Sequence, residues 1–398
     1  MKFDFVGRQR HFGWVWLIAS LAFVLRCAYV LSQGDALRLP DEHRFWCHAL
    51  NLAENFTYAC NGVFAHDMPL TAMFAAVCIK LFGPSTMPVR IGFCLVSSLT
   101  VVVTARLAQA YSRSFLAGIL AALMSSFYPF FIFYSGTVLS ETLFLFFSSL
   151  LFLHFAEGRE AAVRSGLSAG LAHLARPTLL YFLPVAWGWQ VVTGRAAVSR
   201  VLMAVGIFLL VLLGWGVRNQ VFSGHFLVAT HSSGQALWEG NNPWNTTGGV
   251  SEPHWGYMND APTGLDAVEL DRWKKEQALN FIVGNPERFF DSAWKKFLRF
   301  WHLWPNAEKF SSGKYKWASL LSFGPVLLLA LFSPWVLRRQ WKVIALPWLF
   351  MAYYTVLHMI ILGSIRYRLP LEPLLIALGA GVAARFLGSE TARTGRLR

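Results

Sequence analysis

The first long apolar run of the chain, residues 13–31, has the sequence GWVWLIASLAFVLRCAYVL, in which Arg26 is the only charged residue. A helix needs about 20 mainly apolar residues to cross the hydrocarbon core of a bilayer, so this run predicts a membrane-spanning helix. It is too long for a signal peptide and lacks a small-residue cleavage site, so we expect it to remain as a signal anchor.

The rest of the sequence has the same character. Of the 398 residues, 55% are hydrophobic and 14% are charged, whereas a soluble domain has about 25% charged residues. Seven more runs are long and apolar enough to predict membrane spans, namely residues 87–110, 114–133, 139–156, 198–218, 315–336, 343–362 and 370–386. The composition excludes an ordinary soluble protein, and we expect an all-α polytopic membrane protein.

Two further apolar stretches do not fit a single crossing. Residues 165–192 are interrupted by Arg176 and Pro177, and a proline removes a helix hydrogen bond and disfavours helix at the residue before it. We therefore expect two half-crossings that return to the same side, with one full crossing as the alternative. Residues 68–82 form a short run with a proline near its start, so we expect an interfacial or re-entrant helix.

The distribution of Lys and Arg predicts the orientation, because short cytosolic loops are enriched in both. The short segments on one side carry 16 basic and four acidic residues, and those on the other side carry five basic residues. We expect both termini in the cytosol, and the protein in a bacterial inner membrane, with residues 34–86, 134–141, 219–314 and 363–369 outside. The net charge of +14 is then mostly cytosolic loop charge and gives no support to a nucleic-acid partner.

This topology divides the chain into three parts. They are an N-terminal transmembrane module with the first outer loop (1–218), an extracytoplasmic loop domain (219–314), and C-terminal transmembrane helices with a basic tail (315–398). Within the loop domain, helix-like patterns lie near residues 266–284 and 287–303.

Two details of the outer segments carry structural expectations. Cys47 and Cys60 both lie in the first outer loop, where the two alternatives are a disulfide bond between them and two free thiols. Four apolar residues recur at helical spacing and form a stripe: Trp294, Phe297, Leu298 and Trp301. Such a stripe favours an amphipathic helix that lies on the membrane surface.

Acidic residues stand at the outer ends of three segments. Asp41 and Glu42 follow Pro40 at the start of an expected helix, where ordinary capping charge is the alternative to a catalytic role. Asp67 lies where the first outer loop re-enters the membrane. Glu141 begins a very apolar helix; an acid is favourable there, yet ionisable residues near hydrocarbon are costly and commonly functional. We take these four acids as catalytic candidates.

Arginines supply the complementary charge. Arg366 and Arg368 lie on the side where arginine is disfavoured, Arg176 lies at the tip of the expected hairpin, and Arg218 ends a helix on the outer face. Arginine binds phosphate with paired hydrogen bonds. The alternatives are snorkelling to the interface for Arg366 and Arg368, and pairing with the long loop for Arg218.

The long loop contains a turn-rich segment in which amide, hydroxyl and aromatic groups are interleaved. The segment from Trp238 to Trp244 includes Gly240, Asn241 and Asn242. Sugars are bound by such mixtures of hydrogen-bonding and stacking groups, and an ordinary polar loop is the alternative.

Taken in their order along the chain, these motifs resemble those of the polytopic GT-C glycosyltransferases that use a polyprenyl-phosphate sugar. That group includes protein O-mannosyltransferases and the lipid A aminoarabinose transferase, and the resemblance covers about residues 10–385. The matching motifs are Asp41-Glu42 with Arg44, Asp67-Met68-Pro69-Leu70, Ser140-Glu141-Thr142-Leu143, Ala175-Arg176-Pro177-Thr178, Arg218-Asn219, Gly240-Asn241-Asn242-Pro243 and Arg366-Tyr367-Arg368-Leu369-Pro370. The chain departs from related sequences at His66-Asp67-Met68, where Pro or Lys-Pro is common, and it is short for the group.

The resemblance implies a GT-C-like helix bundle with interfacial helices on its outer face, and an enzyme that transfers a sugar from a polyprenyl-phosphate donor to a lipid, glycan or protein acceptor. Asp41 would be the general base, and the donor phosphate would lie among Arg366, Arg368, Arg176 and Arg218. Glu42, Asp67 and Glu141 would orient substrate or hold a divalent cation. Further substrate contacts are expected from Arg44, His66, Tyr367, Asn241 and Asn242.

No cofactor follows with certainty, because the histidines outside the membrane fit no metal-ligand spacing. The alternatives to an enzyme are a transporter or lipid-carrier flippase, and a non-catalytic scaffold. Transporters place charges near the middle of the membrane and often contain inverted repeats, whereas the charges here gather at the outer rim.

Overall fold

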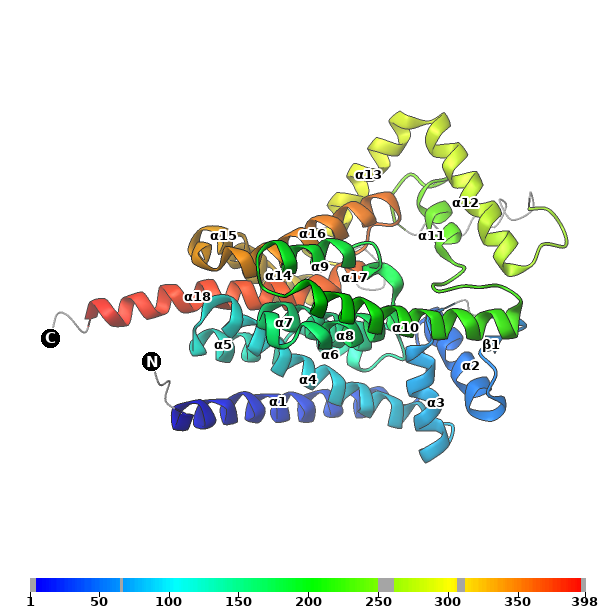
Figure 1. Cartoon of the computed structure of the whole chain (residues 1–398). Coiled ribbons are helices and arrows are strands. Elements are labelled where there is room, and N and C mark those ends of the chain that lie inside the picture. The colour runs from blue at the N-terminus through cyan, green and yellow to red at the C-terminus, as the bar shows by residue number, and fades with distance from the viewer. Residues whose placement is uncertain (1–4, 65–66, 250–260, 306–311, 395–398) are drawn as a thin grey trace.

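The computed structural model describes residues 5–64, 67–249, 261–305 and 312–394. Long helices run side by side through one bundle (Figure 1). The start of α1 (Phe5–Gln33) and the last turns of α18 (Glu372–Thr394) lie at one end, called here the terminal end. At the other end, called the loop end, lie α2 (Pro40–Asn55) and α3 (Leu70–Phe82).

Six helices among the described residues are long and apolar enough to cross a membrane. They are Gly13–Gln33 of α1, α4 (Thr86–Ser112), α7 (Glu141–Glu157) extended to Glu160, α10 (Val198–Ser223), α16 (Trp341–Ile360) extended back to Arg338, and Ile365–Gly388, which joins α17 (Ile365–Arg368) to α18. The first outer loop forms a helix at 70–82, as expected for a short apolar segment. The chain is thus a helical polytopic membrane protein.

The candidate span 114–133 is interrupted by a bend and is not one continuous helix. The segment instead forms α5 (Phe115–Ser126) and α6 (Pro129–Ser135), bent by 55°. The cause is Tyr128, which precedes a proline and adopts an extended conformation with φ −69° and ψ 114°. The carbonyls of Ser125 and Ser126, freed where α5 ends, accept hydrogen bonds of 3.0 and 3.2 Å from the buried guanidinium of Arg26.

Residues 165–192 form the expected hairpin. Helices α8 (Ala162–Ala175) and α9 (Leu183–Val192) are separated by a turn at Arg176 and Pro177. The hairpin returns to its starting end, because the guanidinium of Arg195 donates to the carbonyls of Phe155 and Ala156. Helices α8 and α10 pack closely at Gly166, where a Cβ atom would lie 2.2 Å from the carbonyl oxygen of Ala204.

Other hydrogen bonds involve short segments that the positive-inside count places in the cytosol, among them residues 106–113, 337–342 and 385–398. The indole of Trp189 donates to the carbonyl of Lys342 at 3.0 Å, and Arg385 donates to the carbonyl of Ser112 at 3.2 Å. All of these residues lie at the terminal end, so the two groups of short segments occupy opposite ends of the bundle. The assignment of the terminal end to the cytosol stays a prediction.

The loop end carries most of the structure outside the bundle. A disulfide between Cys47 and Cys60 ties α2 to a small antiparallel hairpin of β1 (Ala59–Cys60) and β2 (Val63–Phe64). The long loop forms α11 (Ser233–Gly240), α12 (Ala267–Gly284) and α13 (Pro286–Phe300). The remaining helices are α14 (Gly313–Leu331) and α15 (Ser333–Val336), which together replace the expected span 315–336.

The apolar stripe on α13 divides between two surroundings. Trp294 and Leu298 are exposed, whereas Trp301 is partly buried and its indole donates to the hydroxyl of Thr355 on α16 at 3.3 Å. The end of α13 therefore packs on the bundle, and its exposed apolar residues stay consistent with the predicted contact with the membrane surface.

Candidate active site

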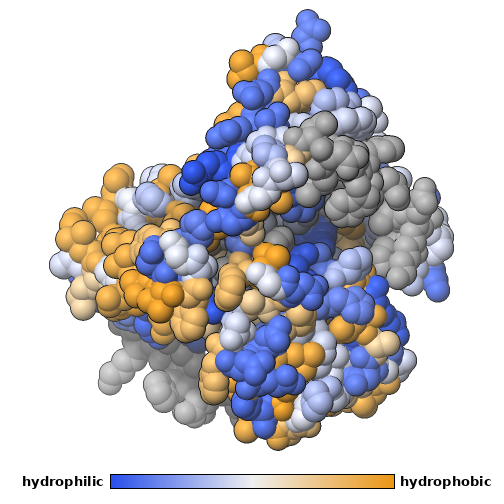
Figure 2. All heavy atoms as spheres, turned by 90° about the vertical axis from the view of Figure 1, so that its right-hand side faces the viewer, coloured by the Kyte–Doolittle hydropathy of each residue, from blue (hydrophilic) through white to orange (hydrophobic). Residues whose placement is uncertain are grey.

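Six charged side chains form one row at the loop end, called here the charged row: Asp41, Arg44, Asp67, Glu141, Arg176 and Arg366. All six were predicted as site residues. They come from α2, the re-entry before α3, the start of α7, the hairpin tip and α17, so segments far apart in sequence converge on one place. Figure 2 looks onto this end and shows hydrophilic side chains around a hollow.

Arg366 lies at the centre of the charged row. Its Nη1 is 2.6 Å from Oδ2 of Asp41, and its Nε donates to Oε1 of Glu141. Arg176 donates to the same Glu141 oxygen at 2.6 Å and to the hydroxyl of Ser140 at 2.8 Å. Two guanidinium groups therefore share one carboxylate, which fixes their positions relative to each other.

Arg44 continues the charged row on the other side of Asp41. Its Nη1 lies 3.4 Å from Oδ1 of Asp41, and its Nε and Nη2 both donate to the carboxylate of Asp67, the latter at 3.1 Å. The pKa of Arg44 is raised: burial lowers it, but the bonds to Asp67 and the charge of Asp41 outweigh that effect. Three acids and three arginines leave the row formally neutral.

Burial separates the acids of the charged row by role. The side chain of Glu141 is 1% exposed, and its Oε2 accepts no hydrogen bond from the residues that the structure describes. The side chain of Asp41 is 32% exposed. A substrate can therefore reach the carboxylate of Asp41, whereas Glu141 acts on the two arginines that it holds.

Glu42 differs from the expectation of a catalytic acid. It is buried, and its carboxylate accepts hydrogen bonds from the backbone N–H groups of Arg38, Leu39 and Val138 at 2.9–3.0 Å. Two of these bonds cap the start of α2, and the third joins that start to the segment before α7. Glu42 therefore caps the start of α2 and positions Asp41, which agrees with the alternative interpretation of Glu42 as an ordinary capping residue.

Arg368 also differs from its expected role. It is fully buried, and it pairs with Glu372 at 3.1 Å and donates to the carbonyls of Phe300 and His302. Its guanidinium lies 3.4 Å from the ring centroid of Phe323. These protein contacts fix the segment that carries Arg366 and leave Arg368 without access to a phosphate.

Three further predicted residues have contacts within the protein. Tyr367 stacks on His358 with ring centroids 4.9 Å apart. The side-chain amides of Asn241 and Asn242 are buried. They donate to the carbonyls of Leu237 and Trp238 on α11, and Oδ1 of Asn242 accepts from the N–H of Trp244, so both residues shape the loop. His66 lies outside the described residues.

Arg218 stands at a separate apolar groove of about 280 Å³. Its guanidinium lies over the rings of Tyr58, Trp215 and Phe222 at 4.7–5.6 Å, and its Nη2 is buried with no hydrogen-bond partner among the described residues. The groove is lined by Leu52, Tyr58, Met73, Leu174, Leu210, Val211, Gly214, Trp215 and Arg218. The hydroxyl of Tyr58 donates to the carbonyl of Asp67 at 2.9 Å, so the groove adjoins the charged row.

Lys296 is a buried residue that the sequence analysis missed. Its ammonium donates to Oδ1 of Asn241 at 2.9 Å and to the carbonyl of Ile360 at 3.1 Å, and burial lowers its pKa to about 7. Beside it, a Cβ atom on Gly240 would lie 1.7 Å from the carbonyl oxygen of Ile361. The signal was Ala293, Lys296 and Phe300 at helical spacing, the buried face of α13.

The described residues contain no group of three or more His, Cys, Asp or Glu side chains that could hold a metal ion. The charged row instead pairs each carboxylate with a guanidinium.

The helices have the GT-C fold, which two solved archaeal structures share. The archaeal oligosaccharyltransferase AglB from Archaeoglobus fulgidus, in complex with an inhibitory peptide and a dolichol-phosphate, matches with a TM-score of 0.56 at 15% identity, over 95% of this chain and 50% of its own. The apo form of the Archaeoglobus fulgidus enzyme matches with a TM-score of 0.55 at 15% identity, over 96% of this chain and 52% of its own.

ArnT from Cupriavidus metallidurans, bound to undecaprenyl phosphate, matches with a TM-score of 0.42 at 16% identity, over 94% of this chain and 78% of its own. The present chain spans about half the length of the archaeal oligosaccharyltransferase. No family model and no curated protein matches the sequence.

Proposed function

We propose that this protein transfers a hexose or pentose from a polyprenyl-phosphate donor to a lipid, glycan or protein acceptor on the extracytoplasmic face of the membrane. The observation that carries the proposal is the charged row at the loop end, where an accessible carboxylate contacts an arginine anchored on a buried acid. The GT-C fold supports the same class of enzyme, because the archaeal oligosaccharyltransferase that shares this fold was solved in complex with a dolichol-phosphate.

In this proposal Asp41 is the general base. Its carboxylate takes a proton from the acceptor hydroxyl or amine as that atom attacks the anomeric carbon of the donor sugar. The bond between the anomeric carbon and the phosphate oxygen breaks, and the polyprenyl phosphate leaves with the bonding electron pair. Because Asp41 and Arg366 are 2.6 Å apart, the base and the leaving phosphate would meet at one centre.

Arg366 and Arg176 are proposed to stabilise the charge that develops on the phosphate. Their shared bond to Glu141 pre-orients both guanidinium groups, so little reorganisation is needed when the charge appears. Arg44 and Asp67 would hold the far side of Asp41 in place, and Tyr367 would contact the substrate beside Arg366.

The apolar groove supports a lipid-linked donor. Most of its wall comes from α10 in the bundle, with single residues from α2, α3 and α8, so a polyprenyl chain can enter it from the bilayer. Arg218, with one buried N–H group lacking a described partner, would receive the phosphate at the end of the chain. The groove adjoins Asp67 through Tyr58, which leads the headgroup towards the charged row.

The direct test is a donor screen with the purified protein and defined polyprenyl-phosphate sugars. We expect one donor to be consumed, and the released polyprenyl phosphate to accumulate with the glycosylated acceptor. Arg176→Gln should reduce this turnover strongly, whereas Arg159→Gln at the terminal end should not. If no donor is consumed by well-folded protein, or if both variants behave alike, the proposal fails.

A further inference from the structure

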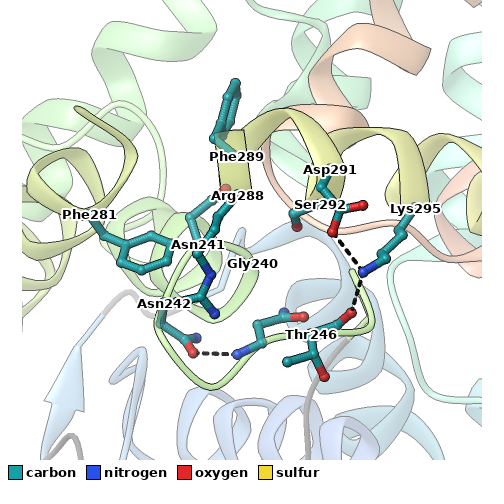
Figure 3. Close-up of a pocket in the computed structure, with 11 residues that line it drawn as sticks. Gly240, Asn241, Asn242, Thr246, Phe281, Arg288, Phe289, Asp291, Ser292 and Lys295 are labelled. Carbon is teal, nitrogen blue, oxygen red and sulfur yellow. Dashed lines mark hydrogen bonds and ion pairs between the residues drawn. The ribbon is translucent and has the colours of Figure 1, made fainter. Parts of the chain in front are cut away.

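A second cavity lies within the loop domain, between the turn after α11 and the helices α12 and α13. It has a volume of about 110 Å³, and Figure 3 shows the side chains that surround it. Its walls are Gly240, Asn241, Asn242, Asn245, Thr246, Phe281, Arg288, Phe289, Asp291, Ser292 and Lys295. None of these residues belongs to the charged row, so the cavity is separate from the proposed reaction centre.

The cavity wall offers polar groups with unused hydrogen-bonding capacity. The hydroxyl of Ser292 is buried and has no hydrogen-bond partner among the described residues. Arg288 donates one bond, of 2.9 Å, to the carbonyl of Pro243, although a guanidinium carries five N–H groups. The buried Ser292 hydroxyl needs a partner, and a bound polar ligand would supply one.

The charges of the wall favour an anion. Asp291 is paired with Lys295 at 2.7 Å, so the charge of Arg288 is left over. The Lys295 ammonium also donates to the carbonyl of Thr246 at 3.2 Å and retains a third N–H group. Two cations therefore flank one neutralised acid, which suits a phosphate or carboxylate group.

An aromatic ring and the size of the cavity further limit the kinds of ligand that fit. The ring of Phe281 points toward Arg288, whose guanidinium lies 5.3 Å from the ring centroid, and Phe289 points away (Figure 3). A ring face beside amide and hydroxyl groups suits the C–H face of a sugar. At about 110 Å³, the cavity is smaller than a pocket that encloses a whole ligand, so it suits the anionic end of one unit of a larger ligand.

The cavity is joined to the segment that carries Arg366. Asn241, in the cavity wall, donates to the carbonyl of Ile360 at 2.8 Å, and Lys296 bonds to both residues. The N–H of Gly363 donates to the carbonyl of Gly248 at 3.1 Å. These hydrogen bonds connect the loop domain to the peptide that precedes Arg366. They therefore fix the position of the cavity relative to the charged row.

We propose that this cavity binds an anionic sugar unit, carrying a phosphate or carboxylate, of the acceptor substrate. Arg288 and Lys295 bind the anionic group, Ser292 bonds to a hydroxyl, and Phe281 contacts the ring. The assignment to the acceptor rests on the proposed glycosyl transfer, whereas binding of the sugar unit itself does not.

The test measures binding of glucose 6-phosphate to the full-length protein in nanodiscs. Binding is detected by saturation-transfer NMR, and no glycosyl donor is present. We expect saturable binding that weakens at least about tenfold in Arg288→Gln, because a charge-assisted hydrogen bond is lost. Ser292→Ala should weaken binding severalfold without lowering stability, since its hydroxyl has no described partner to lose. Lys275→Gln, an exposed α12 residue outside the cavity wall, is the matched control and should bind normally.

Glucose and inorganic phosphate provide the comparison arms. Both should bind more weakly than glucose 6-phosphate, because each lacks one half of the recognised group. The inference is overturned if glucose 6-phosphate does not bind, if Arg288→Gln binds it normally, or if either comparison ligand binds equally well. Since no transfer reaction is measured, these results are independent of whether the proposed donor chemistry occurs.

Discussion

Glu141→Gln is the most informative perturbation of the charged row, because the substitution keeps the size of the side chain and removes its charge. Glu141 is 1% exposed and pairs with Arg176 and Arg366, which are 14% and 27% exposed. Breaking a buried ion pair costs about 3–5 kcal/mol. Arg366 retains Asp41 and some solvent, so we expect the lower end of that range, about 3 kcal/mol of lost unfolding free energy.

The assay is equilibrium unfolding in mixed detergent micelles, with Glu54→Gln as the control. Glu54 lies exposed on α2, and a surface substitution of this kind changes stability by about 0.5 kcal/mol or less. Transfer by Glu141→Gln should also fall about 100-fold, since both arginines lose their shared anchor. If Glu141→Gln matches the control in both stability and turnover, the reasoning about a shared buried carboxylate is refuted.

Three further predictions concern the surroundings of the charged row. Replacing Cys47 and Cys60 by Ser should lower the unfolding free energy by about 2–3 kcal/mol, measured in the same assay, because the bridge closes a loop with a sequence separation of 13. An unchanged midpoint would contradict this. Arg218→Gln should raise the donor KM about tenfold with a smaller change in kcat, measured by initial rates, and the opposite pattern would exclude Arg218 from donor binding. Burial lowers the pKa of Lys296 to about 7 in the folded protein, whereas an unfolded lysine has a pKa near 10.4. Between these two pH values the unfolded state binds more protons than the folded state. The free energy of unfolding should therefore rise with pH, by up to about 1.4 kcal/mol per pH unit. Thermal unfolding at pH 7.5 and 9 should show this slope in the wild type and a smaller one in Lys296→Met; equal slopes would contradict the assignment.

Hydropathy and proline positions predicted much of the fold. The apolar runs identified the long helices, and Arg176-Pro177 predicted the hairpin of α8 and α9. The same reasoning missed the bend at Tyr128-Pro129, because the apolar residues continue on both sides of it. At this position the proline keeps the preceding Tyr128 out of the helical conformation, although the apolar run is long enough for one membrane-spanning helix.

The charged row was predictable as a set of residue types but not as a geometry. Arg366 and Arg368 are two residues apart and look alike in sequence, yet one faces Asp41 and the other is sealed against Glu372. That difference depends on how the short helix α17 is oriented between α13 and α18, which no local pattern encodes. The same holds for Lys296, whose surroundings are created by three separate segments.

The role of Asp41 is tested most directly by sugar transfer from the donor identified in the screen, compared between wild type and Asp41→Asn in the same nanodiscs. Asparagine keeps the shape and can still accept a hydrogen bond from Arg366, but it cannot take up the acceptor proton. We expect transfer to fall at least about 100-fold while the folded protein is recovered in normal yield. Transfer close to the wild-type rate by folded Asp41→Asn would contradict a general base at this position.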